Sequence, residues 1–171
     1  MQQELSHEEI RRRVREALNA CGHSYEIMAC DPALADTADF CAHYGIPPQN
    51  SANTILVKAK TGGERFVACV LLADSKLDVN RVVRKRLGAR RVSFASAEET
   101  RRLSGMVLGG VTPVALPSEV PVWVDARVME ADYIVLGAGV REAKIKVSPM
   151  LFETLPAAEI VEGLAIPLES D

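Results

Sequence analysis

The segment from Phe66 to Leu72 is a nearly unbroken apolar run, and it limits the fold more than any other feature. Such a run is typical of a strand that is covered on both faces of a sheet. The segment from Asn53 to Ala59 alternates with a period of two, and a Gly-Gly turn within Lys60 to Glu64 joins it to the apolar run. The sequence therefore predicts a β-hairpin whose second strand is central.

Four segments start with a capping residue and stop at a glycine, which predicts four helices. They run from Ser6 to Gly22, from Asp31 to Gly45, from Asp78 to Gly88 and from Ser96 to Gly105. Ser148-Pro149 predicts a further brief helix that ends at Leu155.

Short β-type runs occupy much of the remaining chain. They cover Tyr25 to Met28, Arg91 to Phe94, Pro121 to Asp125, Tyr133 to Leu136 and Lys144 to Val147. Strands and helices mix without strict alternation, so we expect an α+β fold, with a mixed, mainly antiparallel sheet or a partial barrel flanked by helices. We expect a single domain over 1–171, with a core at about 23–155, an N-terminal helix in 1–22 and a weakly structured tail in 159–171.

Composition and missing motifs exclude several classes of protein. The four cysteines form no Cys-x-x-Cys pair and the three histidines show no ligand spacing, so we expect no metal and no cofactor. Serine-hydrolase, phosphate-loop and zincin motifs are also missing. The N-terminus is charged and no apolar run reaches the roughly 18 residues of a membrane span, so we expect a cytoplasmic chain without membrane contact.

A glycine-dense loop runs from Ser104 to Pro113, and Gly109 and Pro113 have the spacing Gly-x-x-x-Pro. Adjacent glycines let backbone N–H groups approach an oxygen-rich ligand, and the proline stiffens the exit from the loop. A simple tight turn explains the same residues.

Positive charge gathers in one part of a chain whose net charge is −3. Eight basic residues lie between Arg81 and Arg102 against two acidic ones, Glu98 and Glu99, a local excess of 8 − 2 = +6. Such a patch can attract a phosphate backbone, although a solvated helix face is an equally simple interpretation.

Two features follow predicted strands. Asp125 ends one strand and either projects into a cleft or caps the next helix. Gly137-Ala-Gly139 follows another strand, but Glu142 stands where a dinucleotide-binding loop needs its third glycine. We therefore interpret this segment as a turn close to a site.

Several of these segments, taken in order, resemble one known family. They are Ala52 to Val57, Phe66 to Leu72, Leu87 to Val92, Gly109 to Pro113, Val124 to Ala126, and the turn of Gly137 and Gly139. Over roughly Tyr25 to Phe152 the chain is similar to the YbaK/prolyl-tRNA synthetase-associated editing domain. That family includes Cys-tRNA(Pro) and Ala-tRNA(Pro) deacylases and the editing insertion of bacterial prolyl-tRNA synthetases.

The resemblance implies hydrolysis of a mischarged aminoacyl-tRNA, with N–H groups of the glycine loop at the reacting carbonyl and the water assisted by the substrate's own ribose hydroxyl. It implies a partner, the tRNA acceptor end, and leaves open a homodimer or weak contact with a synthetase. The implied catalytic residues are Asn53, Gly109 and Gly110. Substrate-binding positions are Thr54, Val111, Thr112, Pro113, Asp125, Gly137 and Gly139, and tRNA-binding positions are Arg81, Arg84, Lys85, Arg90 and Arg91.

One position departs from the family pattern. Asn53-Thr54 stands where family members have Lys-Thr, and asparagine donates hydrogen bonds but carries no charge. Lys58 and Lys60 occupy other strand positions. The chain is thus interpreted as a deacylase of a divergent subgroup. The alternatives are a non-catalytic module that binds aminoacyl-tRNA, a small ligand or a partner, and a thiol enzyme that uses Cys41 or Cys69.

Overall fold

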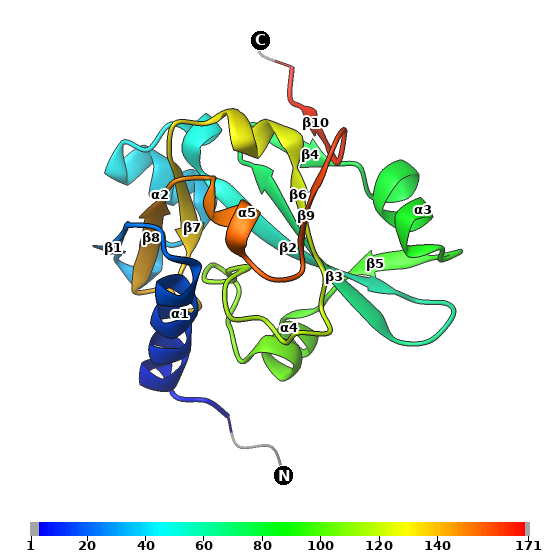
Figure 1. The fold of residues 1–171 in the computed structure, drawn as a ribbon, viewed down its shortest axis with the longest axis horizontal. Helices are drawn as coiled ribbons and strands as arrows, with labels where there is room; N and C mark the ends of the chain where they lie inside the picture. Colours follow the sequence, from blue (N-terminus) through cyan, green and yellow to red (C-terminus); the bar gives the residue numbers. More distant parts are fainter. Residues whose placement is uncertain (1–3, 170–171) are drawn as a thin grey trace.

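The predicted hairpin lies at the centre of a five-stranded sheet in the computed structural model, which describes residues 4–169 (Figure 1). Strands β2 (Ala52–Ala59) and β3 (Arg65–Leu72) pair antiparallel. The sheet order is β5-β2-β3-β6-β9, with β5 at Val92–Phe94, β6 at Val122–Asp125 and β9 at Ala158–Val161. Every residue from Phe66 to Leu72 is at most 8% exposed, as its apolar run predicts.

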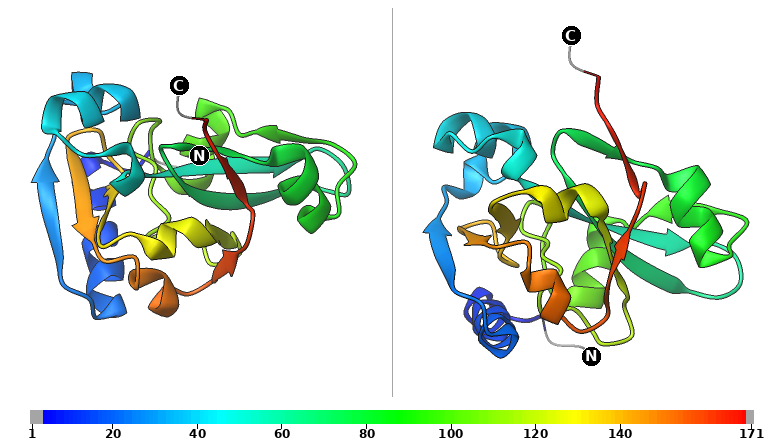
Figure 2. Two further views of the ribbon diagram at one scale, coloured as in Figure 1. Left: turned by 90° about the horizontal axis from the view of Figure 1, so that it is seen from above. Right: turned by 45° about the horizontal axis from the view of Figure 1, so that its top comes forward.

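Two smaller sheets complete the architecture. One has the order β1-β8-β7, with β1 at Tyr25–Ala29, β7 at Ile134–Gly137 and β8 at Ala143–Val147. The other pairs β4 (Ser75–Leu77) with β10 (Ala165–Pro167). Figure 2 shows the β1-β8-β7 sheet at one end of the molecule and the tip of the β2–β3 hairpin at the other. A parallel bridge between Ser51 and Val135 joins β2 to β7.

The helices are short apart from the first. They are α1 (His7–Cys21), α2 (Thr37–Tyr44), α3 (Arg84–Leu87), α4 (Ala97–Ser104) and α5 (Leu151–Thr154). Single turns add η1 (Pro32–Leu34), η2 (Pro48–Asn50), η3 (Val79–Val83) and η4 (Ala126–Glu130). Ser6 and Ser96 accept the predicted capping hydrogen bonds from Glu9 and Glu99, and Asp78 caps η3 in the same way.

The central sheet packs a separate hydrophobic cluster on each face. Ala68, Val70 and Val124 pack against α1 and the β1-β8-β7 sheet. The alternate residues, including Leu71 and Trp123, pack against α3, β4 and β10. Because successive side chains of a strand point to opposite faces, this division also fixes the face of each polar residue on these strands.

The predicted α+β fold with a mixed, mainly antiparallel sheet is confirmed. Only the β3–β6 and β6–β9 pairs are parallel among the strand pairs of residues 4–169. All three sheets are open in this part of the chain, so the strands form no closed barrel.

One predicted helix is wrong in its extent. The segment from Asp31 to Gly45 is broken into η1 and α2, because Asp36 has an extended backbone with φ −68° and ψ 142°. Two distant residues hold the break, since Lys144 donates to the carbonyl of Ala35 and Arg141 donates to the Asp36 carboxylate. These long-range contacts outweigh the local helical pattern.

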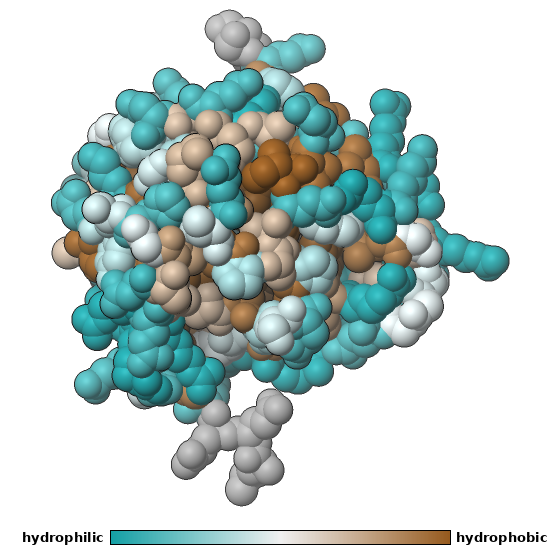
Figure 3. Space-filling model, viewed as in Figure 1, coloured by the Kyte–Doolittle hydropathy of each residue, from teal (hydrophilic) through white to brown (hydrophobic). Residues whose placement is uncertain are grey.

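The prediction of a weakly structured tail is also wrong. The tail forms β9, which pairs with β6, and β10, which pairs with β4; only 170–171 lie outside the described residues. Both strands are short and pair with residues far away in sequence, so local propensity gives little sign of them. Ile160, Ile166 and Leu168 are exposed here, and apolar side chains gather on the face drawn in Figure 3.

Residues 4–169 contain no helix that combines the length and apolarity needed to cross a membrane.

Acid is expected to weaken the fold through the ion pair that joins β2 to α4. Lys58 donates to Glu99, and this bond, together with a weaker effect of the bond from the Ser96 N–H, lowers the pKa of that carboxyl to about 2. A lowered pKa in the folded state stabilises the fold above the ordinary value near 4.5, and this contribution is lost as pH falls toward about 2. The free energy of unfolding, measured in urea, should therefore fall less for Lys58→Met than for the wild type between about pH 5 and about pH 2.5.

Lys60→Met is the matched control, since Lys60 forms no ion pair within residues 4–169. The same pH dependence in both variants would contradict this assignment.

Candidate functional site

The glycine loop lies in backbone contact with the end of β7 and the turn that follows it. A Cβ atom on Gly110 would lie 2.7 Å from the carbonyl carbon and oxygen of Val140. A Cβ atom on Gly137 would lie 2.2 Å from the carbonyl oxygen of Val111. Real Cβ atoms essentially never come within 3.0 Å of such atoms, so both positions require glycine.

Hydrogen bonds fix the direction of the loop peptides. The N–H of Gly110 donates to Val107, and the N–H of Gly139 donates to the carbonyl of Gly110 at 2.6 Å. Carbonyl and N–H point in opposite directions in a trans peptide, so the bond from Gly139 also orients the N–H of Val111. Within residues 4–169, the N–H groups of Gly109, Val111 and Thr112 have no hydrogen-bond partner. Thr112 is 0% exposed, so the accessible donors of this loop are those of Gly109 and Val111, whereas the N–H of Gly110 is already used.

Asn53 lies at the start of β2, near the same end of β7. The Ser51–Val135 bridge is parallel, and Asn53 and Gly137 each lie two residues further along. The Oδ1 atom of Asn53 accepts a hydrogen bond of 2.7 Å from the Thr37 hydroxyl. This contact uses the acceptor end of the Asn53 amide, so the Nδ2 group is the end that can donate to a ligand.

Thr54 points to the opposite face of β2 from Asn53. Its Oγ1 atom is buried and has no hydrogen-bond partner among the described residues. Lys58 shares the Thr54 face and binds Glu99, so it does not reach the position of the Asn53 side chain.

Lys144 lies beside the glycine loop, and the sequence reasoning did not identify it. It is paired with Gly137 across the β7–β8 ladder, and its Nζ atom donates to the carbonyls of Gly109 at 2.8 Å and Ala35 at 2.9 Å. The residue is only 8% exposed, and burial lowers its pKa. Ala143, Ile145 and Val147 of β8 face the hydrophobic core, so Lys144 points to the other face of the β1-β8-β7 sheet. No local pattern showed that the segment around Ala35 covers this second face.

Asp125 lies in the same row of the central sheet as Asn53. Leu71 is opposite Asn53, and the parallel β3–β6 register places Asp125 beside Leu71, so the two polar residues are separated by two strand spacings, about 10 Å. Asp125 is 1% exposed, and burial raises its pKa. Its Oδ1 accepts from the N–H of Ala165, and its carboxylate makes no capping hydrogen bond to η4.

The predicted tRNA-binding cations lie at the far end of the hairpin. The N–H of Lys60 donates to the carbonyl of Arg91, and the N–H of Arg90 donates to the hydroxyl of Thr61. From Asn53 to Ala59 the strand spans about 20 Å, so the basic cluster is remote from the glycine loop. None of its five predicted members pairs with a carboxylate within residues 4–169: Arg81, Arg84, Lys85, Arg90 and Arg91. In contrast, Arg86, Arg101 and Arg102 form ion pairs with Glu159, Glu4 and Glu64.

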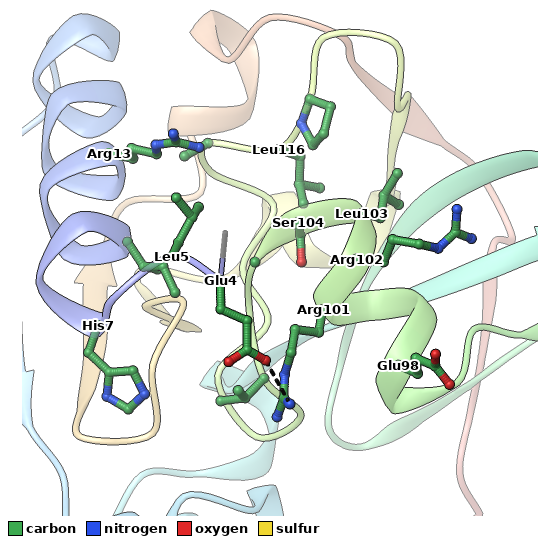
Figure 4. Close-up of a pocket in the computed structure, with 15 residues that line it drawn as sticks. Glu4, Leu5, His7, Arg13, Glu98, Arg101, Arg102, Leu103, Ser104 and Leu116 are labelled. Carbon is green, nitrogen blue, oxygen red and sulfur yellow. Dashed lines mark hydrogen bonds and ion pairs between the residues drawn. The ribbon is translucent and has the colours of Figure 1, made fainter. Parts of the chain in front are cut away.

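A cavity of about 1030 Å³ lies between α1, α4 and the first part of the glycine loop (Figure 4). Leu5, Leu103 and Leu116 contribute apolar walls, and an ion pair joins Arg101 to Glu4 at its edge. Ser104 of the loop reaches this cavity, whereas Asn53 and Gly109 to Pro113 do not line it. It is therefore separate from the region that the resemblance implies.

Cys69, one of the two thiols considered for catalysis, is fully buried in β3. It is 0% exposed, and burial raises its pKa to about 12. Such a thiol is inert at neutral pH. Across residues 4–169 no three His, Cys, Asp or Glu residues cluster closely enough to hold a metal ion.

The open sheets and the donor-bearing glycine loop define an α+β protein with a candidate carbonyl-binding site. The family model of the aminoacyl-tRNA editing domain matches residues 31–155, and the chain belongs to this family. The resemblance drawn from the sequence is confirmed.

Known proteins agree with this assignment. The chain is 34% identical over 98 residues to the proline–tRNA ligase of Bacillus licheniformis. The aligned segment covers 57% of this chain and 16% of that protein. It therefore spans a small part of that relative's length. The crystal structure of the hypothetical protein APE2540 has 26% identity and a TM-score of 0.79, covering 90% of this chain and 99% of that one. A proposed trans-editing enzyme for prolyl tRNA synthetase shares the fold, with 19% identity and a TM-score of 0.77 over 97% and 99% of the two chains.

Proposed function

We propose that this chain is a trans-editing deacylase that hydrolyses the ester between a non-cognate amino acid and the terminal adenosine of a tRNA. Family membership supports the substrate class. The observation that carries the proposal is the pair of N–H groups at Gly109 and Val111, which have no partner within residues 4–169 and lie in a loop packed against Gly137 and Gly139. Such an array suits a carbonyl that becomes negatively charged.

The reaction needs only water. Water adds to the ester carbonyl carbon, and the loop donors hydrogen-bond the oxygen as charge develops on it, each contributing about 3 kcal/mol in well-studied enzymes. The bond from carbon to the ribose oxygen then breaks. The proton lost by the water passes through the neighbouring ribose hydroxyl to the leaving oxygen, so the products are a free amino acid and an uncharged tRNA.

Asn53 would act as a neutral donor in a divergent subgroup of the family. The Thr37 hydroxyl holds its Oδ1 atom, so the Nδ2 group is the end available to the substrate. Asp125 shares the Asn53 face and is proposed to border the same region, whereas Thr54 points to the opposite face of β2 and Pro113 is buried. Burial raises the pKa of Asp125, so its carboxyl group is protonated more readily than that of an exposed aspartate.

The tRNA would extend along the hairpin from the glycine loop to the basic cluster. The basic cluster lies about 20 Å along β2 from Asn53. The cations at Arg81, Arg84, Lys85, Arg90 and Arg91 would then contact the acceptor stem.

A panel of mischarged tRNAs tests the proposal. Purified protein should release the amino acid from at least one of them faster than buffer does. The neutral Asn53 favours a second candidate, a module that binds aminoacyl-tRNA without hydrolysing it. Saturable tRNA binding without turnover on any member of the panel would support that candidate and overturn the enzymatic one.

A further inference from the structure

A lysine reaches the candidate site from a different strand than the family pattern leads one to expect. The position on β2 holds Asn53, and Lys58 on the same strand is bound to Glu99 on the other face. Lys144 projects from β8 and ends at the carbonyl of Gly109, the first residue of the Gly-x-x-x-Pro segment. The glycine loop thus has an ammonium group beside it in spite of Asn53.

The charge of Lys144 has no counterion that would cancel it. Its Nζ atom contacts two backbone carbonyls and lies 5.3 Å from the centroid of the Phe40 ring, and within residues 4–169 it has no carboxylate at ion-pair distance. The nearby Asp36 is bound to Arg141 at 3.0 Å, and burial keeps the Cys30 thiol neutral by raising its pKa. A buried, unneutralised cation is costly, so a structural tie alone is a poor explanation for it.

Lys144 is also connected to Asn53 through one short segment. It donates to the carbonyl of Ala35, and two residues later Thr37 donates to Asn53. The same ammonium therefore fixes the glycine loop on one side and the support of Asn53 on the other. Removing it would release both walls of the candidate site.

We propose that Lys144 is a positioning residue that supplies, from β8, the positive charge and loop support that Asn53 lacks. This inference rests on the proposed deacylase function. Lys144 holds the carbonyl of Gly109 at the start of the loop that carries the N–H of Val111, and places a positive charge beside that loop.

The test is a rescue experiment. Lys144→Met keeps the length of the side chain but removes its charge and donors, and kcat/KM for deacylation should fall about 10- to 100-fold, less than the loss of a direct oxyanion donor. Adding Asn53→Lys to this variant should restore at least about tenfold of that loss without restoring the melting temperature. If Lys144 only stabilised the fold, a lysine at position 53 on β2 would not restore kcat/KM.

Lys146→Met is the matched control, because Lys146 is on the same face of β8 but lies over the Tyr133 ring, 4.6 Å from its centroid. It should keep wild-type kcat/KM. A Lys144→Met variant as active as Lys146→Met, or one that Asn53→Lys does not rescue, would overturn this inference alone.

Binding of a non-hydrolysable aminoacyl-adenosine amide separates the role of Lys144 from the proposed deacylase function. The wild type should bind the amide more tightly than Lys144→Met, and the double variant should recover part of the difference. A wild type that neither binds the amide nor hydrolyses any mischarged tRNA would overturn the proposed function and this inference together.

Discussion

Replacing Gly137 with alanine is expected to lower kcat/KM for deacylation by at least about 100-fold. The new methyl group would lie 2.2 Å from the carbonyl oxygen of Val111 and 2.9 Å from that of Gly110. Both neighbours are backbone atoms, so the loop has to move as a whole. The N–H group of Val111 would then lose its alignment, and kcat should fall while tRNA affinity is kept.

Gly63→Ala is the control for this variant. Gly63 has φ +93°, and a Cβ atom there would have no neighbour within 4 Å among residues 4–169, so the substitution adds backbone strain without a clash. It lies in the turn between β2 and β3, away from the loop. Wild-type kcat/KM in Gly137→Ala, or an equal loss in Gly63→Ala, would contradict the role given to the loop.

Charge reversal in the basic cluster should have the second large effect. The double variant Arg81→Glu with Arg90→Glu should weaken tRNA binding by at least about tenfold and lower the slope of log affinity against log salt by about 2. Each lost phosphate contact removes roughly one released counterion. Fluorescence anisotropy with labelled tRNA over a salt series measures both quantities.

The matched control reverses two arginines on another surface. Arg11 and Arg15 are exposed on α1, and neither forms an ion pair within residues 4–169. Arg11→Glu with Arg15→Glu changes the net charge by the same amount. If both double variants weaken binding equally, general charge rather than this cluster attracts the tRNA.

Hydrophobic patterns and capping residues predicted the strands and helix ends that depend on neighbouring residues in the sequence. The apolar run from Phe66 to Leu72 identified the buried central strand, and Ser96 with Glu99 identified the start of α4. The order of the motifs was sufficient to recognise the family. The departure at Asn53 was visible because that position lies in a regular strand.

Long-range contacts explain what the sequence did not show. Lys144 approaches the glycine loop only because β8 pairs with β7 and the segment around Ala35 folds over it. The same contacts break the helix predicted from Asp31. Similarly, no local pattern shows that the N–H of Gly110 is used by Val107, which moves the available donors to its neighbours.

The most direct test of the central claim is the initial rate of amino acid release from a panel of mischarged tRNAs, with Gly137→Ala measured beside the wild type. The account predicts that the wild type deacylates at least one tRNA faster than buffer and that the variant loses this activity but still binds the tRNA. The account would be contradicted if the wild type bound tRNA but deacylated no member of the panel faster than buffer does.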